Sequence, residues 1–361
     1  MSAALPEIDS EVSRDRTKAA ASGKRSGTYS YSLTGKQLIF DGFKTASGIS
    51  GAVKTISAEG YNYAVVSSNI RLDLRSAFTE LLKAQELVLL TEDIAKRRLQ
   101  NLKLVKLRHE AGREHRGSLL TAEADFARAE FDIEQAKRSV SLAQRKLLKA
   151  LGYDSFKAFT VKGEFFVEGQ YEVRPDFEAI VYDTPFLREL MEKKDAARYG
   201  LRYEEADFVP KVYLNASTSG SDDALPPDRR GWTTGLSVSL PLFEGGSRIA
   251  EVSKARSKLN QAVADERSGR DGALVELEGA WKDLKDAIAY VDVQNKFLDA
   301  AKERAKIASA QYESGLTSFD DWVIIEDNLV NARKAYLNAQ ADMLTAEAYW
   351  IQAIGRYWGR P

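Results

Sequence analysis

Few residues in this chain have the types and the spacing that chemistry requires. The 361 residues contain no Cys and only two His, His109 and His115, which flank Gly112. Without Cys, the sequence excludes disulfides, thiolate zinc sites and a cysteine nucleophile. The two histidines have no acidic cluster at ligand spacing, so we expect turn residues in solvent and no metal site. No nucleophile and base set and no phosphate-binding loop occur, and we therefore expect neither an enzyme nor a cofactor.

The adjacent carboxylates Asp320 and Asp321 are suited to an electrostatic role. Several copies arranged around an axis would repel anions and hold cations, as charged rings do in channels. The same two residues also suit the first turn of a helix, where acidic side chains interact favourably with the helix dipole. Which of the two roles applies depends on the helices and turns that position Asp320 and Asp321.

The overall charge points to no particular partner. Lys and Arg number 52 and Asp and Glu number 53, so the net charge is −1 and no overall field attracts nucleic acid. We therefore expect no nucleic-acid partner. The apolar share of 44% is sufficient for sizeable cores.

A tandem repeat organises the chain. Proline is absent between residues 6 and 175 and between residues 241 and 361, which leaves two long stretches free to be helical. At one constant offset, residues 40–152 match residues 243–355 without a gap. We therefore predict a first repeat at 1–152, a linker at 153–183, a second repeat at 184–355 and a tail at 356–361.

Each repeat is predicted to contain a coiled-coil helical hairpin, at 44–150 and at 247–355. Heptad positions in both hairpins are mostly apolar, and the second arm alternates large residues with Ala. Such alternation lets neighbouring helices approach closely and interdigitate. Trp322, Tyr336 and Trp350 lie on this seam, so we expect them in the core. A first arm of about 65 residues would be ~98 Å long.

Four segments ahead of the hairpins alternate apolar and polar residues, as half-buried strands do. We predict strands at 6–14, 28–40, 210–219 and 232–243, polar loops at 15–27 and 220–231 between them, and a helix at 184–207. Each strand could cross a bilayer or belong to a soluble sandwich. Four strands cannot close a barrel of useful bore, so several chains must contribute. Trp232 belongs to an aromatic girdle at a membrane boundary or packs under a loop.

These elements resemble the TolC-type outer-membrane factor family. The resemblance covers almost the whole chain, and three segments carry it most clearly. They are 210–220 (PKVYLNASTSG), 235–246 (GLSVSLPLFEGG) and 312–321 (YESGLTSFDD).

The resemblance implies an α+β fold in a homotrimer. Three chains of four strands would build one transmembrane β-barrel in the outer membrane, and their helices would continue it as an α-barrel in the periplasm. It implies the channel of a tripartite efflux or type I secretion system, a passive export duct for small molecules or proteins. The implied partners are a periplasmic adaptor protein, an inner-membrane pump and outer-membrane lipid. The linker at 153–183 resembles the belt around the helical tunnel.

The resemblance also implies a role for each hairpin turn. Adaptor contacts are implied at Gly112, Arg113, Gly315, Leu316 and Thr317, although the first turn is more basic than the family's usual apolar tip.

A gate is implied at the second turn. Family members commonly carry two acidic residues three positions apart that narrow the tunnel. Here Asp321 takes the first place, Ile324 takes the second, and Asp320 is a substitute carboxylate. We also expect Arg113 and Arg116 to pair with Asp320 or Asp321.

The rival interpretation is a soluble coiled-coil protein such as a periplasmic hairpin adaptor. An adaptor should carry one hairpin flanked by lipoyl-like and small barrel domains, whereas this chain has two hairpins and neither domain. The channel is therefore favoured.

The beginning of the chain leads to a separate expectation. Pro6 and Pro210 mark equivalent points, but the helix at 184–207 has no counterpart before Pro6. The first twenty residues also lack the pattern of a signal peptide. We expect Met1 to be an internal start, and the complete protein to carry a signal sequence and roughly 40 further residues by analogy with the second repeat.

Overall fold

The computed structural model describes residues 5–18, 25–167, 171–224 and 230–355. They fall into two compact units, one of residues 1–62 and 186–270 and the other of residues 63–185 and 271–361. The long helices α1 (Lys44–Glu110) and α5 (Ser247–Glu313) contribute to both units, so each unit contains part of each repeat.

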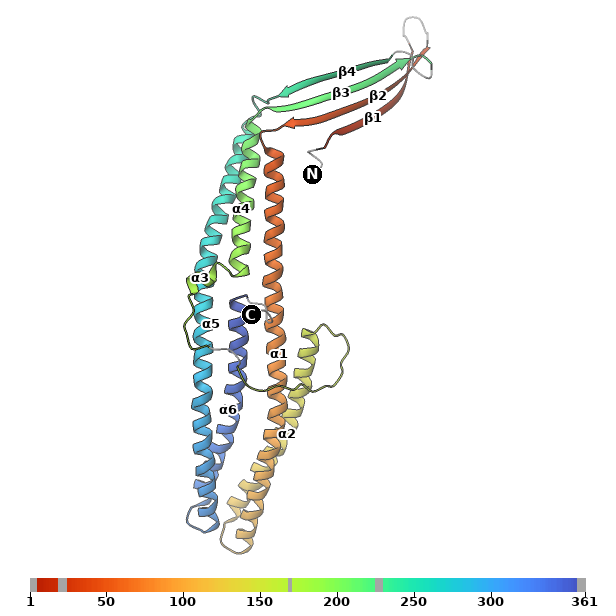
Figure 1. The fold of residues 1–361 in the computed structure, drawn as a ribbon. Coiled ribbons are helices and arrows are strands. Elements are labelled where there is room, and N and C mark those ends of the chain that lie inside the picture. The colour runs from red at the N-terminus through yellow and green to blue at the C-terminus, as the bar shows by residue number, and fades with distance from the viewer. Residues whose placement is uncertain (1–4, 19–24, 168–170, 225–229, 356–361) are drawn as a thin grey trace. The chain divides into compact units, whose positions relative to one another are not determined.

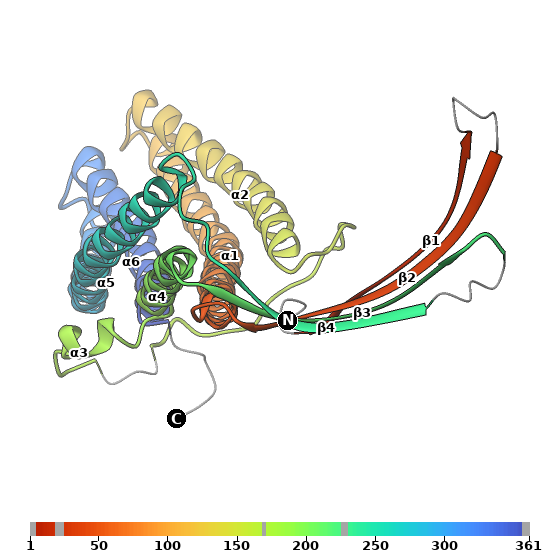
Figure 2. The same ribbon diagram turned by 90° about the horizontal axis from the view of Figure 1, so that it is seen from above.

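The first unit contains a four-stranded antiparallel sheet with the order β1-β2-β3-β4 (Figures 1 and 2). The strands are β1 (Glu7–Lys18), β2 (Arg25–Phe40), β3 (Lys211–Asp222) and β4 (Arg230–Ser239). The sheet curves along its strands, and β1 and β4 lie at its two edges (Figure 2). The four predicted strands are therefore confirmed as one open sheet.

The boundaries of all four strands differ from the predicted ones. β1 and β2 extend beyond 6–14 and 28–40, because residues 15–18 continue to pair with residues 25–28, and β3 runs on to Asp222. The loops predicted at 15–27 and 220–231 are therefore shorter, and their centres lie outside the described residues. β4 ends at Ser239 instead of residue 243, because Pro241 has no N–H to donate to a ladder.

The strand register separates the side chains of the sheet into two faces. One face is mainly polar, although Leu38 and Tyr213 also lie on it, and includes Asp9, Glu11, Ser13, Ser30, Ser32, Thr34, Ser217, Ser219 and Thr233. The other face is mainly apolar, and includes Ile8, Val12, Tyr31, Leu33, Val212, Leu214, Trp232, Leu236 and Val238. The apolar face is exposed: Val12 is 83% and Trp232 is 78% exposed.

Helices support the sheet within the same unit. α4 (Pro185–Glu205) lies beside the first turns of α1 and the corresponding part of α5, with Lys54 bound to Glu192 at 3.0 Å and Lys194 to Glu266 at 2.6 Å (Figure 1). α4 continues into the short helix η2 (Ala206–Phe208). The predicted helix at 184–207 is thus present.

The second unit consists of the remaining parts of α1 and α5 with α2 (Arg116–Ala150) and α6 (Phe319–Ala353). Every seam position from Leu119 to Ala150, and from Trp322 to Ala353, is buried or half-buried. Trp322 is 1% and Trp350 is 5% exposed, and Tyr336 packs against the buried Leu298 and Leu329. The predicted coiled-coil seam and its aromatic core residues are confirmed.

The segment after α2 lies across both hairpins of the second unit. Gln85 of α1 donates to the Val161 carbonyl and accepts from its N–H, both at 2.9 Å. Further on, the Tyr171 ring packs edge-on against Trp281 of α5, and its hydroxyl donates to Glu347 of α6 at 2.9 Å. The short helix α3 (Phe177–Val181) then leads to α4.

The repeat is visible in the backbone as well as in the residues. α1 and α5 both have 67 residues, and α2 and α6 both have 35. The left-handed glycines also occur in equivalent pairs, which are Gly42 and Gly245, Gly112 and Gly315, and Gly152 and Gly355. Equal helix lengths and equivalent turns are consistent with the predicted tandem repeat.

None of the helices in the described part of the chain is both long enough and apolar enough to cross a membrane.

Candidate functional site

The turns of the two hairpins are built alike. Gly112 follows α1 at φ 69° and Gly315 follows α5 at φ 77°, a left-handed conformation that favours glycine. Arg113 and Leu316 beside them are exposed, and Thr317 is half-buried. The five residues predicted to contact an adaptor are therefore at the ends of the hairpins, and four of them face solvent.

An aromatic cluster lies directly behind these turns. The Tyr312 ring stacks on the Trp322 ring with centroids 4.3 Å apart and an angle of 9°, and Phe319 packs against both rings. Val105 of α1, Ala122 of α2 and Ala308 of α5 complete the cluster, and all six side chains are buried. All four helices of this unit therefore share one core at their turn end.

A hydrogen-bond network joins the first turn to the second hairpin. The Tyr312 hydroxyl donates to Glu114 Oε2 at 2.8 Å. Arg108 donates from Nη1 to the Tyr312 carbonyl at 2.7 Å, and its guanidinium lies 4.5 Å from the centre of the Tyr312 ring. Since Glu114 and Arg108 belong to the first repeat, Tyr312 is held by two groups of the other hairpin.

The network shifts the pKa of both partners. Burial acts to raise the pKa of Glu114, but hydrogen bonds from Tyr312, Ser118 and the His115 backbone hold it below its usual value. Burial and the bond to the Glu114 carboxylate raise the pKa of the Tyr312 hydroxyl above its usual value. The bond is therefore one between a carboxylate and a neutral phenol at neutral pH.

A second, charged link lies further along the helices. Arg97 of α1 donates from Nε and Nη2 to Glu326 of α6 at 2.6 and 2.7 Å, and Asn101 donates at 3.3 Å. Glu326 is 1% exposed, and the hydrogen bond to Glu326 raises the pKa of Arg97. A buried carboxylate needs such a partner, so this pair fixes the register of one hairpin against the other.

Further ion pairs continue the same contact between the hairpins. Arg98 pairs with Asp327 and lies 3.6 Å from Asp125, and burial raises the pKa of Asp125. Lys334 of α6 binds Asp132 of α2 at 2.9 Å. The two hairpins of one chain therefore pack side by side through paired charges.

The predicted gate carboxylates lie in the first turn of α6. Asp320 and Asp321 are both exposed. Ser318 caps the helix by accepting from the Asp321 N–H at 3.1 Å, and its hydroxyl donates to Asp321 Oδ2 at 2.7 Å. Asp320 and Asp321 therefore occupy the first turn of a helix, which is one of the two roles expected from the sequence.

The predicted pairing of Arg113 or Arg116 with Asp320 or Asp321 is wrong for a single chain. No ion pair joins these residues in the part of the chain that the structure describes. Asp321 is engaged by the Ser318 cap instead, and the contact between the turns uses Glu114 and Tyr312.

His109 and His115 both make hydrogen-bond contacts within the turn of the first hairpin. His109 Nδ1 lies 2.9 Å from the Glu114 carbonyl oxygen, and His115 caps α2 by accepting from the Ser118 N–H at 3.2 Å. His109 and Tyr312 occupy equivalent positions in the two repeats, and both rings contact Glu114. The sequence did not lead us to predict roles for Tyr312, Glu114, Arg108 or the Arg97–Glu326 pair. The equivalence of His109 and Tyr312 in the repeat is the sequence signal that could have indicated Tyr312.

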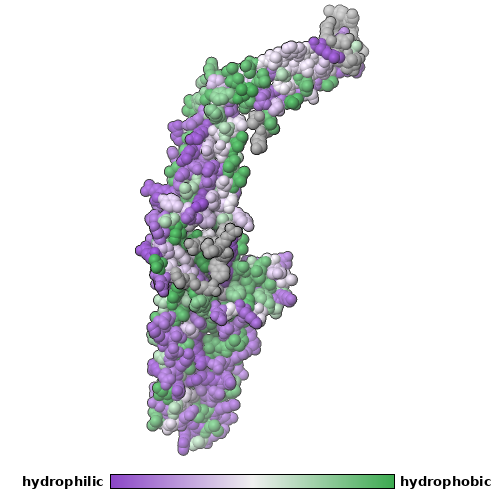
Figure 3. Space-filling model, viewed as in Figure 1, coloured by the Kyte–Doolittle hydropathy of each residue, from purple (hydrophilic) through white to green (hydrophobic). Residues whose placement is uncertain are grey.

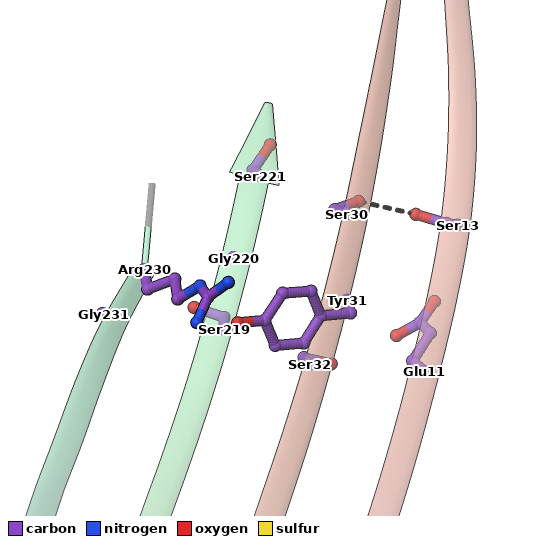
Figure 4. A pocket seen from close by; sticks show the side chains of 10 residues that line it. All are labelled: Glu11, Ser13, Ser30, Tyr31, Ser32, Ser219, Gly220, Ser221, Arg230 and Gly231. Atoms are coloured by element: carbon purple, nitrogen blue, oxygen red, sulfur yellow. Dashed lines mark hydrogen bonds between the residues drawn. The ribbon is translucent and has the colours of Figure 1, made fainter. Parts of the chain in front are cut away.

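A hollow in the sheet gathers hydroxyl groups (Figure 4). Ser13 and Ser30 share a hydrogen bond of 2.8 Å across β1 and β2, and Glu11 lies beside them on the same polar face. The Tyr31 ring covers Gly220, where a Cβ would collide with it. These groups suit contact with water more than a reaction, because the lining is mostly neutral hydroxyls spread along strands, with Glu11 and Arg230 as its charged side chains.

Comparison with known proteins identifies the class of protein to which this chain belongs. The family model described as outer membrane efflux protein matches residues 1–153 and 184–356. The outer membrane efflux protein BepC of Brucella suis is 22% identical over 98% of this chain and 78% of its own length. The alkaline protease secretion protein AprF of Pseudomonas aeruginosa is 24% identical over 78% of this chain and 60% of its own length. The solved structure of CusC superimposes with a TM-score of 0.89 at 16% identity, covering 98% of this chain and 84% of CusC.

A four-stranded open sheet joined to two helical hairpins is therefore the fold of outer-membrane channels. The chain belongs to the outer membrane efflux protein family, as its sequence motifs predicted. It is an outer-membrane channel protein, and its α+β fold class is confirmed.

Proposed function

We propose that three copies of this chain form one passive duct from the periplasm through the outer membrane. The observation that carries this proposal is the open sheet with one polar face and one exposed apolar face. An open sheet with free edges at β1 and β4 satisfies its backbone in lipid only when other strands close it. Three sheets of four strands make a closed barrel with an even strand number.

The two faces assign the inside and the outside of this barrel. Side chains such as Ser30, Ser32 and Thr34 would line a water-filled lumen, whereas Val12, Leu236 and Val238 would contact lipid. The helical hairpins would continue the duct in the periplasm. The duct itself performs no catalysis.

The turn end of the helices is the proposed gate and docking site. Asp320 and Asp321 of three chains would form an acidic ring around the axis. Gly112, Arg113, Gly315, Leu316 and Thr317 would contact a periplasmic adaptor, which joins the duct to an inner-membrane pump. BepC is named for efflux and AprF for secretion of an alkaline protease, so we propose export of either small molecules or proteins through this duct.

Two matched substitutions test the orientation of the sheet. Val12→Asp places a charge on the apolar face, where Arg or Lys costs about 2–4 kcal/mol at the centre of a bilayer and Asp somewhat less, and should reduce insertion into vesicles. Ser13→Asp places the same charge one residue further on, on the polar face, and should insert normally.

The assembly is tested on the purified protein in detergent. Light scattering should give the mass of three chains, and planar bilayers should show single-channel conductance. A monodisperse monomer without conductance, or equal insertion of Val12→Asp and Ser13→Asp, would overturn the proposal.

A further inference from the structure

A cavity of about 570 Å³ lies in the second unit, between its helices and the segment that follows α2. Its lining comes from residues 74–79 of α1, 147–151 at the end of α2, 159–166 of the following segment and 344–347 of α6. Figure 3 shows apolar surface around the end of α2 and the segment after it. Because α1 and α2 form the first hairpin and α6 belongs to the second, this bridging cavity borders both hairpins.

Hydrogen bonds hold the segment after α2 in place along one side of the bridging cavity. Gln85 of α1 bonds to both the N–H and the carbonyl of Val161, each at 2.9 Å. Gln144 of α2 is buried and donates to the Phe159 carbonyl at 2.6 Å. The cavity is therefore preformed, and a ligand would bind without the entropic cost of ordering this segment.

The lining of the bridging cavity is mainly apolar. Phe78, Phe159 and Phe166 contribute aromatic rings, and Leu147 and Leu344 contribute aliphatic side chains. Sites for small molecules have volumes of roughly 300–1,000 Å³ and combine such a lining with a few charged or polar groups. The size of the cavity and its rings therefore fit the apolar body of one small molecule.

Among the described residues, the charged groups of this lining are two carboxylates and one guanidinium, from Glu164, Glu347 and Arg75. Glu347 is 8% exposed and accepts from the Tyr171 hydroxyl at 2.9 Å. Burial and this bond raise the pKa of Tyr171, so the donor stays a neutral phenol and adds no positive charge. One negative charge is thus in excess, and in a partly buried site it favours a cationic ligand over an anionic one.

We propose that the bridging cavity binds an amphipathic amine, whose apolar body packs against the phenylalanine rings and whose ammonium group lies beside Glu164 and Glu347. A bound amine would contact Phe78 of the first hairpin and Leu344 of the second. It binds the packed arrangement of the hairpins better than a separated one, and therefore opposes opening. The binding itself needs only one chain, whereas its effect on opening rests on the proposed duct.

Calorimetric titration of the full chain in phosphatidylcholine nanodiscs tests this site, with empty discs as the blank. Phenylhexylamine is the probe, and phenylhexanol and phenylhexanoate carry the same body without the positive charge. The amine should saturate at one molecule per chain and bind about tenfold more tightly than the alcohol, as expected for one charge-assisted hydrogen bond. The acid should bind most weakly. No saturable binding, or equal affinities of the amine and the alcohol, would overturn the proposal.

Two variants with matched controls locate the bound amine. Leu151→Trp enlarges a 47% exposed side chain of the lining and should abolish binding, whereas Leu142→Trp, at a 58% exposed position of α2 outside the cavity, should not. Glu164→Gln should weaken binding of the amine severalfold and leave that of the alcohol unchanged, and Glu123→Gln at an exposed position of α2 should change neither. Melting temperatures check that each variant folds. Binding of the amine that survives Leu151→Trp would lie elsewhere and contradict the proposal.

The effect on opening separates this inference from the proposed function. In planar bilayers, phenylhexylamine should lower the open fraction of the wild type but not of Leu151→Trp, a difference that block of the lumen by a cation would not produce. An equal effect on both proteins, or no effect on either, would overturn the bridging role. A chain that binds the amine in nanodiscs but forms no conducting channel would contradict the proposed duct and leave the amine site intact.

Discussion

The Tyr312 hydroxyl donates a hydrogen bond of 2.8 Å to Glu114, and this bond connects the turn of the first hairpin with the end of the second. His109, the residue at the equivalent position of the first repeat, contacts the carbonyl of the same Glu114. Two side chains at equivalent positions of the repeat therefore contact one residue, His109 at the Glu114 carbonyl and Tyr312, from the other hairpin, at the Glu114 carboxylate. If the hairpins separate when the duct opens, this bond must break.

The first prediction concerns Tyr312→Phe, which removes the hydroxyl and keeps the stacked ring. A hydrogen bond to a charged group contributes about 1.5 kcal/mol at the low end, so the equilibrium should shift roughly tenfold toward separated turns. The low end applies because Ser118 still donates to Glu114. Single-channel recordings should show a higher open fraction than in the wild type. Tyr290→Phe on an exposed position of α5 is the control, and equal behaviour of the two variants would exclude a gating role.

The second prediction is the pH dependence of this contact. The lowered pKa of Glu114 means that its contribution is present above the usual carboxyl pKa and is lost as pH falls through the folded value. The raised pKa of Tyr312 means that its contribution is present below the usual phenol value and is lost only in strong alkali. The difference in open fraction between wild type and Tyr312→Phe should be constant from about pH 5 to about pH 9 and shrink in stronger acid. A change centred near neutral pH would point to another group.

The third prediction tests the buried pair of Arg97 and Glu326. Arg97→Met leaves the Glu326 carboxylate buried without a charge partner, and should cost about 3 kcal/mol of stability. Adding Glu326→Gln removes that charge, so the double variant should melt at a higher temperature than Arg97→Met alone. Lys146→Met breaks an exposed pair with Glu80 and should change the melting temperature little. Additive effects of the two substitutions would mean that the pair is not coupled.

Much of the fold was predictable because the sequence is periodic. A heptad seam determines which face of each helix is buried, and alternation determines the two faces of each strand. Neither pattern determines how one hairpin lies against the other, since that register depends on Tyr312 and Glu114, which are 198 residues apart. The β-bulge between Leu38 and Phe40 of β2 could not be predicted from the sequence either, because it depends on pairing with Val212 of β3 and not on the residues of β2 alone.

The fourth prediction concerns the alternation of large and small seam residues. Ala129 is 5% exposed and packs against Ile94 and Ala95 of α1, with Val330 of α6 close by. Ala129→Leu should overpack this site and cost about 1–3 kcal/mol. Ala127→Leu adds the same methyl groups two residues away on the exposed side of α2. Circular dichroism melting should therefore separate the two variants, and equal melting temperatures would mean that the hairpins are loosely packed.

The last prediction concerns the charge at the proposed gate. Asp321→Asn keeps a side chain that can accept from Ser318, and the Ser318 cap on the Asp321 N–H does not need the carboxylate, so helix α6 should still begin normally. If the carboxylates of Asp320 and Asp321 surround the axis, removing both with the double Asn variant should lower cation preference more than either single change. Reversal potentials in a salt gradient measure this preference directly. Glu303→Gln removes an exposed carboxylate from α5, away from the turn, and serves as the matched control. A reversal potential that is unchanged in the double variant would show that selectivity arises elsewhere, with the acidic face of β1 at Asp9 and Glu11 as the next place to examine.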